Sequence, residues 1–165
     1  MRVILGLGAN LGEPARAFRT ALEGLSELAR VLRVSALYRS APVGPPQPEY
    51  RNAAVLLDSP LPLLDLLGRC QALERAAGRD RSREARWGPR PLDIDLLLAD
   101  GIVVRGRRLV LPHPRLLERP FALVPAAEVA PEAVHPLAHR TLAALARGTA
   151  AGLSPLGPPG WHETG

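Results

Sequence analysis

The sequence predicts an α/β (α+β) ferredoxin-like fold, in which an antiparallel sheet carries helices on one face and is followed by a C-terminal helical extension. Short apolar or β-branched runs alternate with stretches whose apolar residues recur every three or four positions, in the order strand, helix, strand, strand, helix, strand. Hydrophobic residues make up 47% of the chain and charged residues 22%, as in ordinary globular proteins. A length of 165 residues suits one domain, so we expect residues 1–165 to form one unit with a loosely held tail at about 152–165.

The first part of the chain supplies three of the predicted strands and one helix. Residues 3–7 form an apolar, β-branched run that ends in a turn cluster, and Pro14 opens a helix because the first helical position needs no N–H. Residues 31–38 and 50–57 each have the pattern of a strand. Four prolines and a glycine within residues 40–49 exclude a helix or a central strand and predict a long, stiff loop.

The second part begins with a helix over 62–77, whose apolar residues stay in phase before Gly78. An arginine-rich loop over 79–91 and a strand over 92–98 follow. Asp100-Gly101 is a hairpin turn signal, so we expect residues 102–104 to return beside that strand.

Towards the end of the chain, prolines punctuate residues 109–121, and the stiff segment around His113 cannot be a regular helix. Apolar residues over 137–146 predict a last helix.

The ionisable residues narrow the possible chemistry. All 21 basic residues are arginine, which excludes a Schiff-base, P-loop or kinase-type lysine. The net charge of +5 and the pI near 10.8 favour anionic partners. Cys70 is the single cysteine, which excludes an internal disulfide and fits a reducing compartment. No apolar run approaches the ~20 residues that span a bilayer, so we expect a cytoplasmic protein without a membrane partner.

The most informative segment is the strand over 92–98. Alternation would turn Asp93 and Asp95 to one face, while Leu92, Ile94, Leu96 and Leu98 point into the core. Two like charges on one face of a strand repel each other, and a divalent cation compensates for this well. Mg²⁺ prefers one or two carboxylates together with phosphate oxygens. The alternative is an ordinary solvated sheet face.

An arginine cluster precedes this strand. Residues 79–90 contain five arginines against two acidic residues, and guanidinium groups grip phosphate in a planar fork. Cations beside a carboxylate pair suit a polyphosphate substrate, although a basic surface loop is the alternative. Trp87 within the loop is equally interpretable as a loop anchor or as a ligand contact.

Four further residues stand out by their position. Glu74 lies on the buried stripe of its helix near the C-terminal end, so it needs a partner, either an arginine or a ligand donor. Tyr50 and Asn52 share one face of a strand, where a ring and an amide suit a flat heterocycle. His113 lies between two prolines, and such a histidine alone is more often structural or surface-exposed than functional.

Together these residues resemble a known family. Residues 86–97 (RWGPRPLDIDLL) are similar to the signature of 6-hydroxymethyl-7,8-dihydropterin pyrophosphokinase, also called 2-amino-4-hydroxy-6-hydroxymethyldihydropteridine diphosphokinase. Residues 6–12 resemble the N-terminal strand and turn of this family, 38–44 and 50–55 its pterin-side loop and strand, and 111–121 its nucleotide-side loop. These stretches follow one another in the order and at the spacing of the family.

The resemblance implies an activity. The family transfers pyrophosphate from ATP to the hydroxymethyl group of 6-hydroxymethyl-7,8-dihydropterin, which gives the pterin diphosphate and AMP in folate biosynthesis. The protein would be an ATP- and Mg-dependent diphosphotransferase that uses two Mg²⁺ ions and ATP as co-substrate. Its partners would be these small molecules, with no nucleic acid and no membrane, and it would be a monomer.

The resemblance also assigns site residues by position. The implied catalytic residues are Arg81, Arg90, Asp93 and Asp95, and the implied metal ligands are Asp93 and Asp95. The implied ATP contacts are Gln71, Glu74, Arg79, Arg81, Arg86, Trp87, Arg90, Ile94, Leu96, Arg108, His113 and Arg119. The implied pterin contacts are Ser40, Val43, Tyr50, Asn52, Asp93 and Phe121.

Two alternatives belong to other functional classes. One is a different Mg²⁺-dependent nucleotidyl or phosphoryl transferase on the same sheet, which product analysis separates by its release of ADP or pyrophosphate. The other is an arginine-rich RNA-binding module, which needs exposed aromatic residues on the central strands. Aromatic residues make up only 4% of the chain, and the strand in question carries two aspartates, which argues against this alternative.

Overall fold

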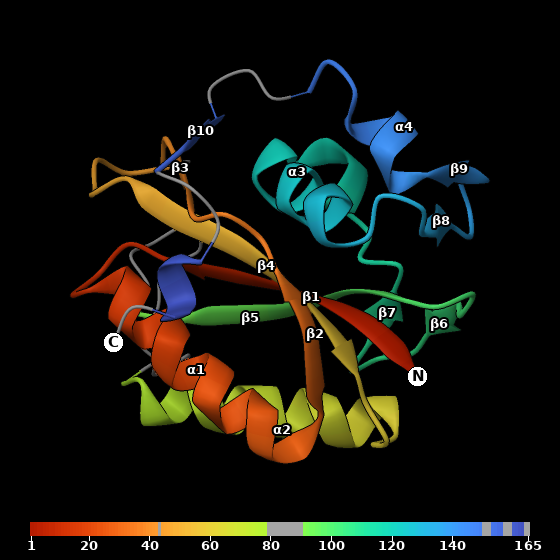
Figure 1. The fold of residues 1–165 in the computed structure, drawn as a ribbon, viewed down its shortest axis with the longest axis horizontal. Helices are drawn as coiled ribbons and strands as arrows, with labels where there is room; N and C mark the ends of the chain where they lie inside the picture. Colours follow the sequence, from red (N-terminus) through yellow and green to blue (C-terminus); the bar gives the residue numbers. More distant parts are fainter. Residues whose placement is uncertain (43, 79–90, 150–152, 157–159, 164–165) are drawn as a thin grey trace.

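A six-stranded sheet lies between two layers of helices in the computed structural model (Figure 1). The structure describes residues 1–42, 44–78, 91–149, 153–156 and 160–163. The sheet is made of β1 (Arg2–Ala9), β2 (Arg30–Val34), β3 (Tyr38–Ser40), β4 (Tyr50–Asp58), β5 (Asp93–Ala99) and β10 (Leu153–Pro155). Every pairing in it is antiparallel.

The strand order confirms the predicted fold class. Strands run β10-β3-β4-β1-β5, and β2 pairs with β4 beside β3. The four long strands therefore lie in the order β2-β4-β1-β5, with β1 and β4 at the centre. Central strands lack a solvent-exposed edge, so what they carry on their faces is held firmly in place.

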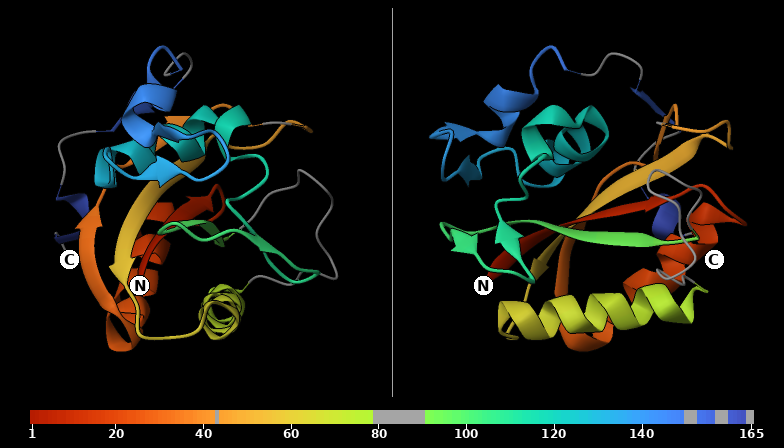
Figure 2. Two further views of the ribbon diagram at one scale, coloured as in Figure 1. Left: turned by 90° about the vertical axis from the view of Figure 1, so that its right-hand side faces the viewer. Right: turned by 180° about the vertical axis from the view of Figure 1, so that it is seen from behind.

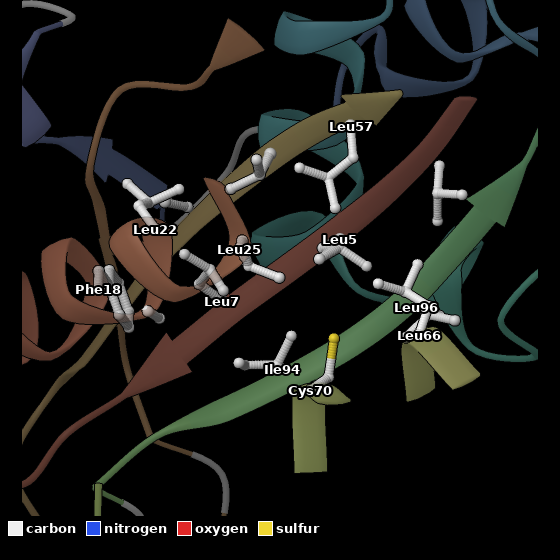
Figure 3. Packing of buried hydrophobic residues seen from close by; sticks show 14 of the residues in the cluster. Leu5, Leu7, Phe18, Leu22, Leu25, Leu57, Leu66, Cys70, Ile94 and Leu96 are labelled. Atoms are coloured by element: carbon white, nitrogen blue, oxygen red, sulfur yellow. The ribbon is translucent and has the colours of Figure 1, made fainter. Parts of the chain in front are cut away.

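One face of the sheet is covered by α1 (Pro14–Leu28) and α2 (Leu63–Ala76), below the sheet in Figure 1. Pro14 occupies the start of α1, as its ring geometry favours. The core on this side is built from apolar residues of both helices and of the central strands (Figure 3), among them Leu5, Leu7, Phe18, Leu25, Cys70 and Ile94.

The other face carries α3 (Pro120–Val129) and α4 (Leu142–Ala146), which lie above the sheet when it is seen from behind (Figure 2). The two helices predicted between the strands thus cover one face, as expected, and the C-terminal segment covers the other. The C-terminal segment adds a second layer because the strands are apolar on both sides: Ile4, Ala54 and Leu97 pack against Leu123 and Ala126 of α3, in a second core cluster.

A β-bulge changes the alternation predicted for β5. Leu5 pairs with Leu96 and Ile4 with Leu98, so Leu97 is an extra residue between two pairs. Leu98 consequently joins the cluster under α3 instead of the core under α1 and α2. Leu97 is itself buried, so its face of the strand is not an open polar surface.

Two other predicted strands take different forms. The strand predicted over 31–38 is broken at residues 35–37, where the Ser35 hydroxyl accepts a hydrogen bond from the Ala54 N–H at 2.8 Å. Gly101 forms the predicted turn with a φ of 65°. However, β6 (Val104–Arg105) pairs with β7 (Val110–Leu111) and not with β5.

The C-terminal helices also differ from the prediction. The prediction assigns no helix to residues 120–129, where the structure has α3 with Pro125 inside it. The predicted helix over 137–146 begins only at Leu142, after β8 (Val134–His135) and β9 (Arg140–Thr141). The imidazole Nδ1 of His135 accepts hydrogen bonds from the N–H groups of Leu137 and Ala138, which stabilises a turn there.

The described parts of the C-terminal segment contact the rest of the fold. Strand β10 pairs with β3, and Trp161, in the 3₁₀ turn η3 (Trp161–Glu163), packs edge-on against Phe18 at 6.0 Å between ring centroids. The indole N–H of Trp161 donates to the Ser35 carbonyl at 2.8 Å. Another 3₁₀ turn, η2 (Leu116–Glu118), precedes α3. Within the described residues, no helix has the length and apolar character to cross a bilayer.

Candidate active site

A cavity lies over the central strands on the face that carries α3. Strands β1, β4 and β5 form its floor, and the start of α3 with the loop before it forms one wall. Of the predicted site residues, the structure brings together Tyr50, Asn52, Asp93, Asp95, His113, Arg119 and Phe121. The remaining lining residues are Gly6, Leu7, Gly8, Ala53, Leu97 and Ala122.

The strand register aligns the polar groups of the floor. Gly8 of β1 lies directly opposite Asn52 on one side and Asp93 on the other, and Gly6 lies opposite Asp95. Directly paired residues point to the same face, and neighbouring strands are about 4.8 Å apart, so Asn52 and Asp93 lie about 10 Å from each other across the glycine.

The glycine between these groups leaves the floor open. A Cβ on Gly8 would meet only the Asn52 Oδ1, at 3.7 Å, whereas a Cβ on Gly6 would come within 3.2 Å of Leu97. Glycine inside a strand often marks a place where a ligand approaches the backbone closely. This signal was present in the sequence, but neither glycine was assigned a site role.

Asn52 is held in a fixed orientation. Its side chain is only 4% exposed, and its Nδ2 donates a hydrogen bond to the Ser40 Oγ of β3 at 2.8 Å. This bond sets the direction of the amide, so that the Oδ1 lies on the side of Gly8. Ser40, a predicted contact, is therefore buried behind Asn52 and orients it.

Two aromatic rings line the cavity from different elements. Tyr50 begins β4, and Phe121 lies in the first turn of α3. The guanidinium carbon of Arg119, the N-cap residue of α3, lies 5.8 Å from the centroid of the Phe121 ring. A cation at this distance from a ring face is attracted to it, so the two side chains support each other.

The two predicted carboxylates lie side by side. Burial raises the pKa of Asp95, and the neighbouring Asp93 raises it further by like charge and by a hydrogen bond between the two carboxyl groups. The Arg119 guanidinium acts in the opposite direction. A further positive charge at the pair would therefore favour the ionised form of Asp95.

Two adjacent carboxylates, one of them with a raised pKa, fit a divalent cation, which would supply such a charge. Among the described residues, no group of three or more His, Cys, Asp or Glu side chains is arranged to hold a metal. An ion at the Asp93–Asp95 pair would take its other ligands from water or substrate, which is the coordination that Mg²⁺ favours.

His113 lines the cavity from the loop that follows β7. Its backbone N–H donates to the Leu97 carbonyl at 2.8 Å, which fixes the loop to β5. Its Nδ1 accepts from the Arg115 N–H at 3.2 Å, so in the neutral ring the proton is on Nε2. Burial, followed by Arg119, lowers the pKa of His113. The ring is thus a neutral donor at physiological pH.

Glu74 lies on the other side of β5, in α2. It is 1% exposed, and its carboxylate accepts a hydrogen bond from the Ile94 N–H at 2.9 Å. Ile94 lies between Asp93 and Asp95, so this bond holds the strand at the point where the carboxylate pair is displayed. The predicted need for a partner is met in part by a backbone donor.

The other predicted ATP contacts in the described residues do not line this cavity. Gln71 is half-buried on α2, Ile94 and Leu96 are buried between β5 and α2, and Arg108 is exposed in the loop between β6 and β7. The remaining predicted residues lie outside the described part of the chain, namely Val43, Arg79, Arg81, Arg86, Trp87 and Arg90.

A carboxylate pair, an oriented amide and two aromatic rings above a bare floor are typical of a small α/β enzyme with a cavity suited to a planar ligand beside a cation. A family model described as 7,8-dihydro-6-hydroxymethylpterin-pyrophosphokinase (HPPK) matches residues 4–131. The chain belongs to this family, whose members transfer pyrophosphate to hydroxymethyldihydropterin in folate biosynthesis.

Individual relatives agree with this assignment. The chain is 46% identical over 136 residues to the 2-amino-4-hydroxy-6-hydroxymethyldihydropteridine pyrophosphokinase of Methylorubrum extorquens, covering 81% of this chain and 85% of that protein. It is 42% identical over 134 residues to the enzyme of the same name from Pseudomonas aeruginosa, covering 79% and 82% respectively.

Solved structures show the same fold at lower sequence identity. Plasmodium falciparum HPPK-DHPS with pteroate superposes with a TM-score of 0.71 at 13% identity, over 88% of this chain. The chain spans only 43% of the length of that protein. This likeness supports the fold, and the sequence relatives support the family.

Proposed function

We propose that this chain transfers pyrophosphate from ATP to the hydroxymethyl group of 6-hydroxymethyl-7,8-dihydropterin at the cavity over β1, β4 and β5, and that it needs Mg²⁺ to do so. The observation that carries the proposal is the placement of Asn52 and Asp93 on either side of Gly8. One end of the floor suits a heterocycle, and the other suits a cation with phosphates.

The pterin would lie between the Tyr50 and Phe121 rings. Flat rings stack favourably on aromatic side chains, and burial of their faces adds hydrophobic stabilisation. The Asn52 amide, oriented by Ser40, would pair with the polar edge of the heterocycle. We place Val43 at this end of the cavity from the family resemblance.

The triphosphate would lie at the other end. Asp93 and Asp95 would hold Mg²⁺, and we propose two ions; a bound metal would screen the phosphate charge from the carboxylates and polarise the β-phosphorus. Arg119 would neutralise phosphate oxygens, and His113 would donate a hydrogen bond from Nε2. Further phosphate and nucleotide contacts are proposed from the family resemblance at Arg79, Arg81, Arg86, Trp87, Arg90 and Arg108.

Residues on α2 and β5 would complete the nucleotide side. Gln71 and Glu74 lie on α2, and the buried Ile94 and Leu96 lie against that helix. Because Glu74 is 1% exposed and bonded to the Ile94 backbone, we propose that it acts mainly by fixing β5.

The reaction follows from charge and position. The pterin hydroxymethyl oxygen attacks the β-phosphorus and its proton is released to solvent, while the bond from that phosphorus to the α–β bridging oxygen breaks and AMP leaves. Negative charge grows on the bridging and non-bridging oxygens, so positively charged groups aimed there lower the barrier. The protein contributes chiefly by holding the two substrates in line.

Product analysis tests the proposal. The protein is incubated with ATP, the hydroxymethyl dihydropterin and Mg²⁺, and the products are separated by ion-exchange chromatography. Equal amounts of AMP and pterin diphosphate are expected, with little turnover after chelation by EDTA. Release of ADP or of free pyrophosphate would instead identify a different phosphoryl or nucleotidyl transferase.

We further propose that residues 1–165 act as one domain and as a monomer in the cytoplasm. Cys70 is buried, and burial, Glu74 and Asp95 raise the pKa of its thiol to about 12, which keeps it unreactive. Light scattering at several protein concentrations tests the monomer: a mass near 17.7 kDa is expected throughout.

A further inference from the structure

The two aromatic walls of the cavity belong to elements that are far apart in the sequence. Tyr50 lies on β4, whereas Phe121 lies on α3, above the sheet in Figure 1. The width of the slot between them therefore depends on how α3 is fixed to the sheet.

Apolar packing alone fixes this position poorly. The residues that α3 buries include Leu123, Ala126 and Val129, which touch the sheet through contacts that have no preferred direction. Such contacts stabilise the layer but specify the exact placement of a helix less strongly than hydrogen bonds do.

Glu128 provides directional contacts. One carboxylate oxygen accepts a hydrogen bond from the Ala36 N–H at 2.6 Å, and the other accepts from the Tyr38 hydroxyl at 2.6 Å. Among the described residues, these are the only hydrogen bonds between a side chain of α3 and the sheet or the break between β2 and β3. Ala36 is 5% exposed, so its N–H depends on this acceptor.

Tyr38, one of the two donors to Glu128, is paired with a residue that lines the cavity. Tyr38 lies opposite Asn52 in the pairing of β3 with β4, so the two side chains point to the same face. Ser40, two residues further along β3, accepts the hydrogen bond that orients Asn52. Burial and Glu128 raise the pKa of Tyr38, which keeps its hydroxyl protonated as a donor.

Glu128 is connected to Phe121 through helix α3. Glu128 follows Phe121 by seven residues in the same helix, which corresponds to about two turns, or roughly 10 Å along the axis. A rigid helix of this length transmits a shift at Glu128 to the ring at its start.

We propose that Glu128 is a positioning residue for the pterin. By tying α3 to Ala36 and Tyr38, it sets the spacing between the Phe121 ring and Asn52 on the floor of the cavity. The inference rests on the proposed function only in taking the pterin as the ligand of this slot. At the triphosphate end, only Arg119 lies at the start of α3, whereas Asp93, Asp95 and His113 lie outside this helix.

The test measures binding of each substrate separately by calorimetry, using Glu128→Ala. We expect the Kd of the pterin, measured with Mg²⁺ and a non-hydrolysable ATP analogue, to rise at least about tenfold, since small misplacements of a binding group have large effects. The Kd of the ATP analogue should rise clearly less than the Kd of the pterin, because only Arg119 among its proposed contacts lies at the start of α3. An unchanged pterin Kd, or an equal rise for both ligands, would overturn the proposal.

Two milder variants keep the test decisive if Glu128→Ala folds poorly. Tyr38→Phe removes a single hydroxyl, and we expect the same pterin-specific weakening at about threefold or more. Glu128→Gln retains an acceptor for the Ala36 N–H and a group that bonds to the Tyr38 hydroxyl, so it should restore much of the affinity. Wild-type pterin binding in Tyr38→Phe, or no recovery in Glu128→Gln relative to Glu128→Ala, would contradict the proposal.

Glu132→Ala is the matched control. Glu132 is exposed and lies just beyond α3, and its variant should bind both substrates as the wild type does. Pterin binding by the wild-type protein distinguishes failure of the proposed function from failure of the positioning role. If it binds no pterin, the proposed function fails; if it binds pterin and the Glu128 variants bind it equally well, only the positioning role fails.

Discussion

Asn52 of β4 and Asp93 of β5 are both paired with Gly8 of β1, so an amide and a carboxylate face the same cavity from either side of a residue without a side chain. The three strands are adjacent and antiparallel, which fixes this arrangement by backbone hydrogen bonding alone. The predictions below test what each part of it contributes.

Asp95→Ala should reduce the rate of AMP formation by at least about 10³-fold, because it removes a central electrostatic group. Asp100→Ala, at the exposed turn after the same strand, is the control and should keep wild-type turnover. Both rates are measured at saturating Mg²⁺. Near-normal turnover of Asp95→Ala would refute a metal role for the pair.

Gly8→Val should fold but lose substrate affinity. A Cβ at this position meets only the Asn52 Oδ1 at 3.7 Å, so the branched side chain would occupy the floor of the cavity. We expect the pterin Kd to rise at least about tenfold while the melting temperature changes little. Gly68→Val on α2, where a Cβ meets nothing within 4 Å, should leave affinity unchanged. Equal affinities for the two variants would show that the floor is not a binding surface.

Ser40→Ala should weaken pterin binding, although Ser40 acts through Asn52 and not by direct contact with the ligand. The variant removes the acceptor of the 2.8 Å bond that orients Asn52, leaving a buried amide free to rotate. The expected effect is about threefold to tenfold on the pterin Kd, smaller than for Asn52→Ala, since a neutral hydrogen bond contributes about 1 kcal/mol. A Ser40→Ala effect larger than that of Asn52→Ala would contradict this order of roles.

Glu74→Ala should lower the free energy of unfolding by about 2 kcal/mol, because it leaves the buried Ile94 N–H without its acceptor. Glu74→Gln keeps an acceptor oxygen and should lose clearly less. Urea unfolding followed by circular dichroism measures both. Equal stability of the alanine variant and the wild type would argue against Glu74 as a support of β5.

The metal-free protein should lose stability as pH rises. The folded state raises the pKa of Asp95 above its ordinary value of 3.8, so the protonated carboxyl is favoured by folding. Its contribution is fully present below that ordinary value and is lost as the pH rises towards neutrality. Mg²⁺ should flatten this slope by neutralising the ionised pair. Asp93→Asn, which removes the like charge, should also flatten it, and an unchanged slope in that variant would contradict the assignment.

Local patterns in the sequence were sufficient for much of the site. The alternation of a strand placed Asp93 and Asp95 on one face, and the spacing of Tyr50 and Asn52 placed them on another shared face, because side-chain direction in a strand has a period of two. The helix begun by Pro14 was predicted from proline geometry in the same way.

Other features were beyond such patterns. The bulge at Leu97 turned Leu98 to the opposite core, because register between strands depends on both partners. Helix α3 has no counterpart in the prediction, and the apolar contacts that stabilise it are made with the sheet.

The sequence by itself determined which chemical groups this protein has: paired carboxylates, an amide, aromatic rings and arginines in place of lysine. The tertiary structure decided which of them meet. Strand pairing placed Asn52 of β4 and Asp93 of β5 on either side of Gly8 of β1, although Gly8 and Asp93 are more than 80 positions apart in the sequence. Docking of α3 then brought Arg119 and Phe121 over it and linked Glu128 to Tyr38. These are long-range contacts, whose formation depends on burial of both sheet faces and which no local period encodes.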